Sequence, residues 1–270
     1  MSDALANTAD APARPDAGHT GGPPRLRFVA ASRRYVDGSG VGPVDLDVGP
    51  DRLTAVVGPS GCGKSTLLRL AAGLEEPTGG SIGERSGRVG YVFQEPRLLP
   101  WLTARANVAL PLELAGRGRD GRGEAVEAAL ALAGLPADSR DKRPHELSGG
   151  MRMRVAIARA VVDRPDVLLL DEPFGALDSL SRDTLDDELR TLWLDRRVPT
   201  LFVTHDVAEA VYLSDRVVVL AGRPGRVAEV IDVPFGDGRR AELRGTPEFA
   251  AVVGQALATL RRETADGAEP

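Results

Sequence analysis

Short apolar runs alternate along this chain with longer segments in which apolar residues recur at helical spacing. Apolar runs bounded by Gly, Pro or polar residues are typical of strands, and they occur here at 26–31, 44–48, 53–57, 89–93, 167–170, 200–204, 216–220 and 226–230. Helical patterns occur at 67–71, 104–114, 124–132, 149–162 and 247–262. The run at 167–170 is wholly apolar, as in a central strand covered on both faces. The pattern therefore predicts an α/β fold built on a parallel sheet.

The strand patterns before residue 57 lie close together. Residues 44–48 alternate between apolar and polar positions, which is typical of a strand with one buried face. Gly and Pro residues at 37–43 and 49–50 mark turns between these strands. The runs at 26–31, 44–48 and 53–57 therefore predict a small antiparallel N-terminal β subdomain that leads into the glycine-rich loop after residue 57. The helical patterns from 104 onward predict an inserted α-helical subdomain at about 97–160.

The stretch from Leu53 to Gly73 combines a buried strand, a glycine-rich loop and a helix. The loop consists of Gly58, Pro59, Ser60, Gly61, Cys62, Gly63, Lys64, Ser65 and Thr66. This order is the context that a phosphate-binding loop requires. Glycines let consecutive backbone N–H groups turn inward on an anion, and the start of the following helix adds a positive dipole end.

The polar residues of this loop suit a nucleotide. Lys64 can reach the β- and γ-phosphates as a point charge, and the Ser65 hydroxyl can ligate Mg²⁺. Only two of the 34 basic residues, Lys64 and Lys142, are lysines, and one of them stands where this chemistry prefers an ammonium. The sequence therefore predicts nucleotide binding at this loop.

A carboxylate pair, Asp171 and Glu172, follows the apolar run at 167–170. Ligands of open α/β sheets bind at the carboxyl ends of the strands. Asp171 can hold Mg²⁺ there, and Glu172 can accept a proton from an attacking water. Such a pair says little alone, but together with a phosphate loop upstream it predicts a catalytic site.

Three further residues are candidates because of their places beside strands. Gln94 follows the run at 89–93 and can ligate Mg²⁺ or orient a water, although an isolated Gln is ordinarily a polar loop residue. His205 closes the run at 200–204, where a capping or solvent-facing histidine is the alternative. The ring of Tyr35 can stack on adenine, and a half-buried strand tyrosine explains that residue equally well.

Two other segments stand out. Ser148, Gly149 and Gly150 form a helix start, with a hydroxyl cap followed by exposed backbone N–H groups. The run from Leu98 to Leu102 is too apolar for an ordinary loop. It is either the buried start of the helical subdomain or a patch that binds a partner.

Composition limits the class of protein. The 270 residues can bury one substantial core, with 42% hydrophobic and 27% charged residues as in a soluble globular protein. The net charge of −5 gives no reason to expect nucleic acid as a partner, and a single cysteine excludes an intrachain disulfide. No apolar run approaches the ~20 residues of a transmembrane helix. Residues 1–24 lack the pattern of a signal peptide, and we expect a disordered tail there.

Together these motifs resemble those of the nucleotide-binding subunit of an ABC transporter, from roughly Leu26 to Asp215 and in the order of that family. The glycine-rich loop resembles Walker A, residues 147–151 resemble the ABC signature, and residues 167–173 resemble Walker B. Gln94 resembles the Q-loop glutamine, and residues 175–178 resemble the D-loop. His205 resembles the switch histidine, and Tyr35 resembles the A-loop aromatic. The signature departs from the commonest form because Met151 stands where Gln is usual, so a side-chain hydrogen bond from that position is lost.

The resemblance implies a RecA-like P-loop core in an ABC ATPase domain at 25–245, followed by a C-terminal helix and tail at 246–270. It implies ATP and Mg²⁺ as cofactors, the metal held by Ser65, Gln94 and Asp171, and catalysis by Glu172, His205 and Gln94. Two copies would pack head to tail, each ATP lying between the Walker A loop of one and Ser148, Gly149 and Gly150 of the other.

The resemblance also implies partners and a place in the cell. A transmembrane permease would dock near Leu98 to Leu102, an extracytoplasmic solute-binding protein would act indirectly, and the chain would lie peripherally on the cytoplasmic face of the inner membrane. Residues 93–114 and 246–249 resemble ATPases of nitrate, sulfonate and taurine importers. The alternatives are an exporter subunit, a soluble ABC-type ATPase acting on nucleic acid or ribosomes, and a module that binds ATP without turnover, against which Glu172 and His205 argue.

Overall fold

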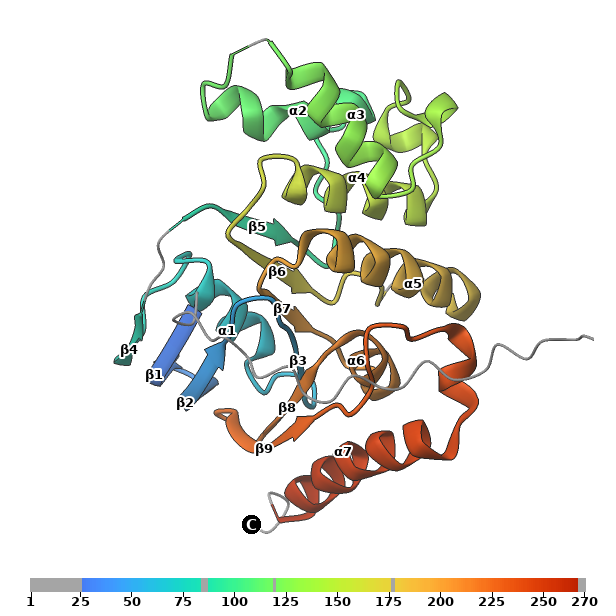
Figure 1. Ribbon diagram of the computed structural model, residues 1–270. Coiled ribbons are helices and arrows are strands. Elements are labelled where there is room, and N and C mark those ends of the chain that lie inside the picture. Colours follow the sequence, from blue (N-terminus) through green and yellow to red (C-terminus); the bar gives the residue numbers. More distant parts are fainter. Residues whose placement is uncertain (1–25, 84–86, 119, 176–177, 267–270) are drawn as a thin grey trace, which may run out of the picture.

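The computed structural model describes residues 26–83, 87–118, 120–175 and 178–266, so the tail expected at 1–24 lies outside it (Figure 1). The strands are β1 (Leu26–Arg34), β2 (Gly40–Val48), β3 (Leu53–Val57), β4 (Gly79–Gly83), β5 (Val89–Val92), β6 (Val167–Asp171), β7 (Thr200–Val203), β8 (Arg216–Ala221) and β9 (Arg226–Asp232). The α-helices are α1 (Lys64–Ala71), α2 (Ala104–Leu114), α3 (Arg122–Leu132), α4 (Gly149–Val161), α5 (Ser179–Arg196), α6 (Val207–Leu213) and α7 (Pro247–Asp266). Short 3₁₀ helices span Ala137–Ser139, Pro144–Glu146 and Ala241–Gly245.

The main sheet has six strands in the order β5-β6-β7-β3-β8-β9. Its first five strands run parallel, and β9 is antiparallel to β8. The parallel sheet expected from the sequence is thus confirmed, with one antiparallel edge strand added. Since successive residues of a strand face opposite sides, Ala55 and Val57 pack into one core while Val56 packs into the other.

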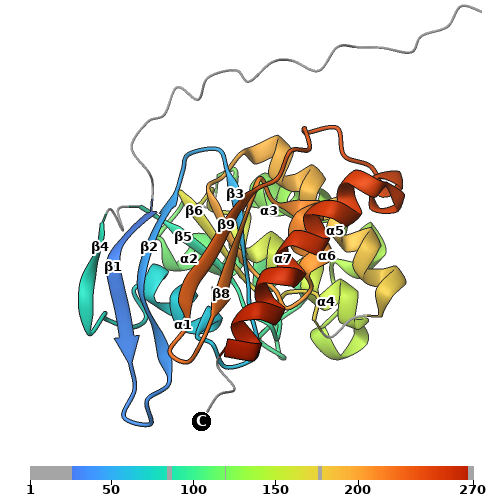
Figure 2. The same cartoon turned by 90° about the horizontal axis from the view of Figure 1, so that it is seen from below.

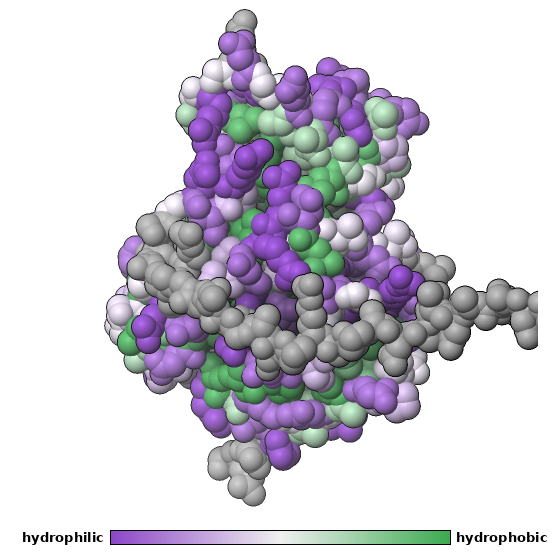
Figure 3. All heavy atoms as spheres, in the orientation of Figure 1, coloured by the Kyte–Doolittle hydropathy of each residue, from purple (hydrophilic) through white to green (hydrophobic). Residues whose placement is uncertain are grey.

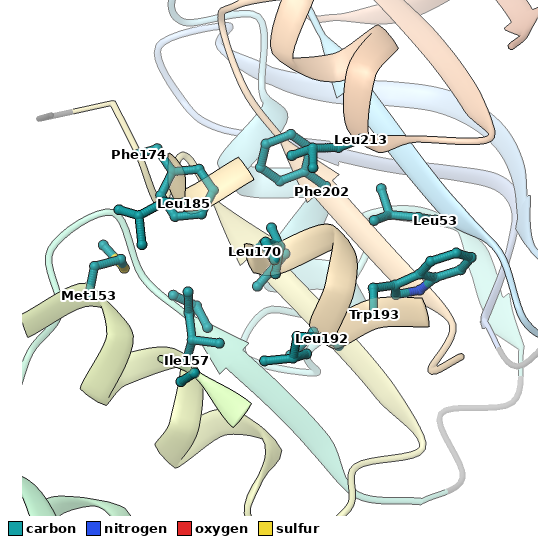
Figure 4. Close-up of a cluster of buried hydrophobic side chains, with 14 of the residues drawn as sticks. Leu53, Met153, Ile157, Leu170, Phe174, Leu185, Leu192, Trp193, Phe202 and Leu213 are labelled. Carbon is teal, nitrogen blue, oxygen red and sulfur yellow. The ribbon is translucent and has the colours of Figure 1, made fainter. Parts of the chain in front are cut away.

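Helices cover both faces of this sheet. On one face, Leu170 and Phe202 meet side chains of α4 and α5, among them Ile157, Leu185 and Trp193 (Figure 4). On the other face, α1 lies between the main sheet and a second, three-stranded sheet. Helices α2, α3 and α4 form a separate group beside β5, at the top of Figure 1. Among the described residues, none of the helices combines the length and the apolar character needed to cross a membrane.

The small antiparallel sheet differs in membership from the prediction. Its order is β2-β1-β4, and Figure 2 shows these strands to one side of the main sheet. The run at 53–57 belongs to the main sheet as β3 instead. Pattern analysis missed β4 because Gly79-Gly80-Ser81-Ile82-Gly83 has a single large apolar residue. It also placed 40–43 in a turn, whereas these residues extend β2 by pairing Val41 and Gly40 with β1.

The helices expected at 104–114, 124–132, 149–162 and 247–262 are confirmed to within a few residues as α2, α3, α4 and α7. The sequence pattern identified neither α5 nor α6.

Two arginines from other segments of the chain hydrogen-bond the C-terminal end of α6. Arg239 donates to the carbonyls of Val211 (3.1 Å), Tyr212 (2.8 Å) and Ser214 (2.7 Å), and Arg190 to that of Leu213 (2.7 Å). These bonds satisfy carbonyls that a helix end leaves unpaired.

The two tryptophans allow a matched test of the core between the sheet and α5. Trp193 is 1% exposed and donates its indole N–H to the Val198 carbonyl at 2.8 Å, whereas Trp101 is 66% exposed. We expect Trp193→Ala to lower the free energy of unfolding by about 3–5 kcal/mol, because it leaves a cavity in a packed core. Trp101→Ala should cost under about 0.5 kcal/mol. Urea titrations followed by circular dichroism measure both, and equal losses would contradict this description of the core.

Candidate nucleotide-binding and hydrolysis site

The predicted phosphate loop joins β3 to α1 as expected. Gly63 is the N-terminal cap of α1 and has φ +99°. A Cβ atom there would lie 2.3 Å from the Gly40 carbonyl oxygen and 2.8 Å from Val41 Cβ, so only glycine fits. Cys62 is buried and not part of a disulfide, and burial raises the pKa of its thiol. Cys62 is therefore a packed part of the loop.

Lys64 folds back along the loop that precedes it. Its side chain is 6% exposed, and Nζ donates to the carbonyls of Gly58 (2.9 Å) and Pro59 (3.2 Å). Nζ also lies 3.8 Å from Glu172 Oε1. The ammonium is therefore held at the loop, where a bound phosphate would meet it, with a carboxylate beside it.

Asp171 ends β6 beside the start of α1. Ser65 Oγ donates to Asp171 Oδ1 at 2.9 Å, and the Tyr91 hydroxyl donates to Oδ2 at 3.3 Å. Burial raises the pKa of Asp171, and the hydrogen bonds from Ser65 and Tyr91 oppose that rise. A hydroxyl and a carboxylate side by side are hard oxygen donors of the kind that Mg²⁺ takes together with substrate phosphates. These two residues fit that metal.

Glu172 is the first residue after β6, and its backbone leaves the strand conformation with φ +44°. In a regular strand, successive side chains point to opposite faces. The left-handed turn instead lets both carboxylates face the loop, Asp171 toward Ser65 and Glu172 toward Lys64. Glu172 Oε2 also lies 3.0 Å from His205 Nδ1. Backbone strain of this kind clusters at functional sites.

His205 follows β7, the neighbour of β6, and its side chain is 53% exposed. With Glu172 ionised, Nδ1–H is the donor of the bond between them. The next residue, Asp206, caps α6 by accepting from the N–H groups of Ala208 (2.9 Å) and Glu209 (3.2 Å). Glu209 is buried, hydrogen-bonds the Thr204 hydroxyl, and has its pKa raised by burial to about 7. His205 thus lies in the turn between β7 and α6, which the hydrogen bonds of Asp206 and Glu209 stabilise.

The remaining predicted residues take no part in the hydrogen bonds and the ion pair that join Lys64, Ser65, Asp171, Glu172 and His205. Gln94 is exposed, two residues beyond β5, whose neighbour is β6. The Tyr35 hydroxyl donates to Glu75 Oε2 at 2.6 Å, so in this arrangement its phenol group bonds to a residue beyond the end of α1. Ser148 is exposed and caps α4, accepting from the Met151 N–H at 3.2 Å. Helix α4 packs on α2, α3 and β5.

Sequence analysis missed two residues that shape the site, and part of one motif lies outside the described residues. Tyr91 was placed in a strand, but the pattern does not show that its hydroxyl meets Asp171. Arg159 donates to the carbonyls of Pro96 (2.8 Å) and Arg97 (2.9 Å), which fixes the segment just after Gln94. Burial lowers the pKa of Arg159. Within the D-loop candidate, Ala176 and Leu177 are not among the described residues.

A phosphate loop whose lysine and hydroxyl meet two strand-end carboxylates defines the class of P-loop nucleotide hydrolases. The model of the family described as ABC transporter matches residues 41–175. An aliphatic sulfonates import ATP-binding protein of Mesorhizobium japonicum is 46% identical over 238 residues, covering 86% of this chain and 87% of the relative. One of Rhodopseudomonas palustris is 44% identical over 243 residues, covering 88% and 83%.

A solved dimeric structure of an ATP-binding cassette in a post-hydrolysis state, bound to ADP and Pi, is 29% identical. It covers 78% of this chain and 100% of its own, with a TM-score of 0.69. The chain therefore belongs to the ABC transporter family, as its ATP-binding and ATP-hydrolysing subunit. The resemblance found in the sequence is confirmed, and so is the fold class.

The position of Glu172 predicts the effect of removing its charge. Glu172→Gln keeps the shape of the side chain but cannot accept a proton, so we expect kcat to fall by roughly 10²–10⁴-fold while ATP still binds. Phosphate release and equilibrium ATP binding measure the two effects. The exposed Glu248 supplies the control, Glu248→Gln. Near-normal turnover of Glu172→Gln would refute its assignment as the base.

Lys64 is tested against the chain's other lysine. Lys64→Ala removes the ammonium from the loop, so we expect the Kd for ATP to rise by at least about 100-fold, as for the loss of charge-assisted hydrogen bonds. Lys142 bonds Ser139 Oγ at 3.2 Å in the 3₁₀ region, and Lys142→Ala should leave the Kd unchanged. Isothermal titration with ATP compares them. Equal affinities of the two variants would argue against nucleotide binding at the loop.

Proposed function

We propose that this chain powers the import of nitrate-, sulfonate- or taurine-like small solutes through a separate permease. The observation that carries the proposal is its 42–46% identity to relatives named as aliphatic sulfonates import ATP-binding proteins, over more than four-fifths of this chain. The sequence features at 93–114 and 246–249 support the same class. An exporter subunit is the alternative.

The catalytic roles proposed for the site follow from its geometry. Glu172 takes a proton from the attacking water, and His205, bonded to it at 3.0 Å, fixes the direction of that carboxylate. Lys64 and the loop N–H groups bind the phosphates, while Ser65, Asp171 and Gln94 are the proposed ligands of Mg²⁺. A metal held by these residues would supply the positive charge that neutralises phosphate oxygens. Tyr35 is proposed to stack on adenine after its ring leaves Glu75.

We propose that the working site needs a second copy of the chain. The exposed Ser148 and the half-buried Gly149 and Gly150 form the positively polarised start of α4. This helix packs within the α2, α3 and α4 group rather than on α1. A head-to-tail dimer would place Ser148, Gly149 and Gly150 of one copy on the ATP held by the other. The dimeric form of the similar solved cassette supports this arrangement.

The proposed permease contact centres on the exposed Trp101. Leu98, Leu99 and Leu102 around it are half-buried, so both interpretations of this run apply in part. The buried Asn107 ties the loop down: its amide group donates to the carbonyls of Leu99 and Leu102 at 3.2 Å each. The face in Figure 3 is mainly hydrophilic with small hydrophobic patches. Tryptophan is enriched at interface hot spots, and a permease bound at Trp101 would bring the chain to the cytoplasmic face of the inner membrane.

A pull-down from detergent-solubilised native membranes tests this function. Tagged Glu172→Gln protein with ATP should co-purify a polytopic membrane protein, and adding Trp101→Ala should reduce its recovery. Uptake of taurine or an alkanesulfonate by vesicles that hold the recovered complex then tests the solute class. Recovery of only soluble or nucleic-acid partners would refute the transport assignment, although the hydrolytic site could stand.

A further inference from the structure

The outer side of the phosphate loop is covered by the turn between β8 and β9, a hairpin visible in Figure 2. Arg223 in this turn donates from Nη2 to the Ser60 carbonyl oxygen at 2.6 Å. Its guanidinium also lies against Gly61, since a Cβ atom built there would be 3.2 Å from Nη2 and 3.3 Å from Cζ. The side chain thus covers the peptide that joins Ser60 to Gly61.

The turn is itself fixed against the loop. A Cβ atom on Gly225 would lie 1.9 Å from the Cys62 carbonyl oxygen, so the two backbones touch. The Gly42 N–H donates to the Gly225 carbonyl at 2.7 Å, and the Gly225 N–H donates to the Gly40 carbonyl at 3.2 Å. Gly40 in turn packs on Gly63. Arg223 therefore projects from backbone that is held in place beside the loop by both β2 and the loop.

The peptide geometry gives this contact a consequence for binding. In a trans peptide, the carbonyl of one residue and the N–H of the next point in opposite directions. The Ser60 carbonyl points toward Arg223, to which it is hydrogen-bonded. The N–H of Gly61, at the other side of the same peptide, therefore points away from Arg223 and toward the side of the loop that faces the phosphates. The Cys62 N–H donates to the Pro59 carbonyl at 3.3 Å and closes a turn around this peptide. Such a bond joins the ends of a turn and is compatible with either direction of its central peptide. Gly61 has φ +78° and no side chain that would oppose a reversal of that peptide.

We propose that Arg223 is a positioning residue for nucleotide binding. By holding the Ser60 carbonyl, it keeps the Gly61 amide aimed at the phosphates, and it does so without touching the nucleotide. Preorganising a donor in this way removes the cost of ordering it when the anion binds. The charge of the guanidinium strengthens its bond to the carbonyl relative to a neutral donor.

The test compares three variants of the full chain. Arg223→Met keeps the length of the side chain but removes every donor, and Arg223→Lys restores one donor. Arg226→Met is the control, because Arg226 lies on the same hairpin, is exposed and pairs with Glu263 at 2.7 Å. Isothermal titration with ATP and with ADP gives the Kd values, steady-state phosphate release gives kcat and KM, and thermal unfolding without nucleotide reports on folding.

We expect Arg223→Met to raise the Kd for ATP and for ADP equally, by about tenfold, which corresponds to 1.4 kcal/mol. KM should rise in parallel, while kcat at saturating ATP stays within about twofold because Glu172 and His205 are untouched. Arg223→Lys should recover part of the affinity. Arg226→Met should match the original chain in every measurement, and the unfolding midpoint should be the same for all.

Four results would overturn the proposal. An unchanged Kd for Arg223→Met would show that the contact does not order the loop. Weaker binding of ATP alone would indicate direct contact with the terminal phosphate. An equal loss in Arg226→Met would point to the hairpin in general. A lower unfolding midpoint for Arg223→Met, with no rescue by Arg223→Lys, would assign the loss of affinity to folding.

Discussion

The parallel pairing of β3, β7 and β6 is the constraint on which the site depends. Parallel strands end at the same edge of a sheet, so the phosphate loop after β3, Asp171 and Glu172 at the end of β6, and His205 after β7 must converge there. These groups are separated by up to about 150 residues of sequence, yet hydrogen bonds and ion contacts of 2.9–3.8 Å connect them. Because helices and the second sheet bury both faces of these strands, only the strand ends are available to bind a ligand.

Charge balance is the second requirement of this edge. A 6% exposed ammonium is costly to bury unless it is paired, and Lys64 meets carbonyls of its own loop and the carboxylate of Glu172. Asp171 is similarly supported by hydroxyls of Ser65 and Tyr91. The protein thus maintains a set of groups whose natural complements are phosphate oxygens and a divalent cation.

Segments outside the sequence motifs hold the elements of the site in position. The β8–β9 turn lies against the loop through Gly225 and Arg223, and Arg239 and Arg190 bond the end of α6, whose start follows His205. Residues after β8 therefore contact both the phosphate loop and the helix that follows His205. Helix α4, in contrast, packs with α2, α3 and β5, and its capping residue Ser148 bonds within its own helix start rather than to this cluster. That separation is the structural reason for proposing that a second copy completes the site.

The sequence by itself determined the local elements and the chemistry. Glycine spacing, the strand-end positions of Asp171, Glu172 and His205, and the cap at Ser148 follow from backbone preferences that neighbouring residues decide. It predicted the parallel sheet because the wholly apolar run at 167–170 indicates a strand covered on both faces. Only the tertiary structure decided which strand joins which sheet, so β3 was assigned wrongly to the small sheet and the glycine-rich β4 was missed. Contacts such as Tyr91 with Asp171 and Arg223 with Ser60 were likewise out of reach. They join residues 80 and 163 positions apart, and such pairings depend on how whole elements pack rather than on any local pattern.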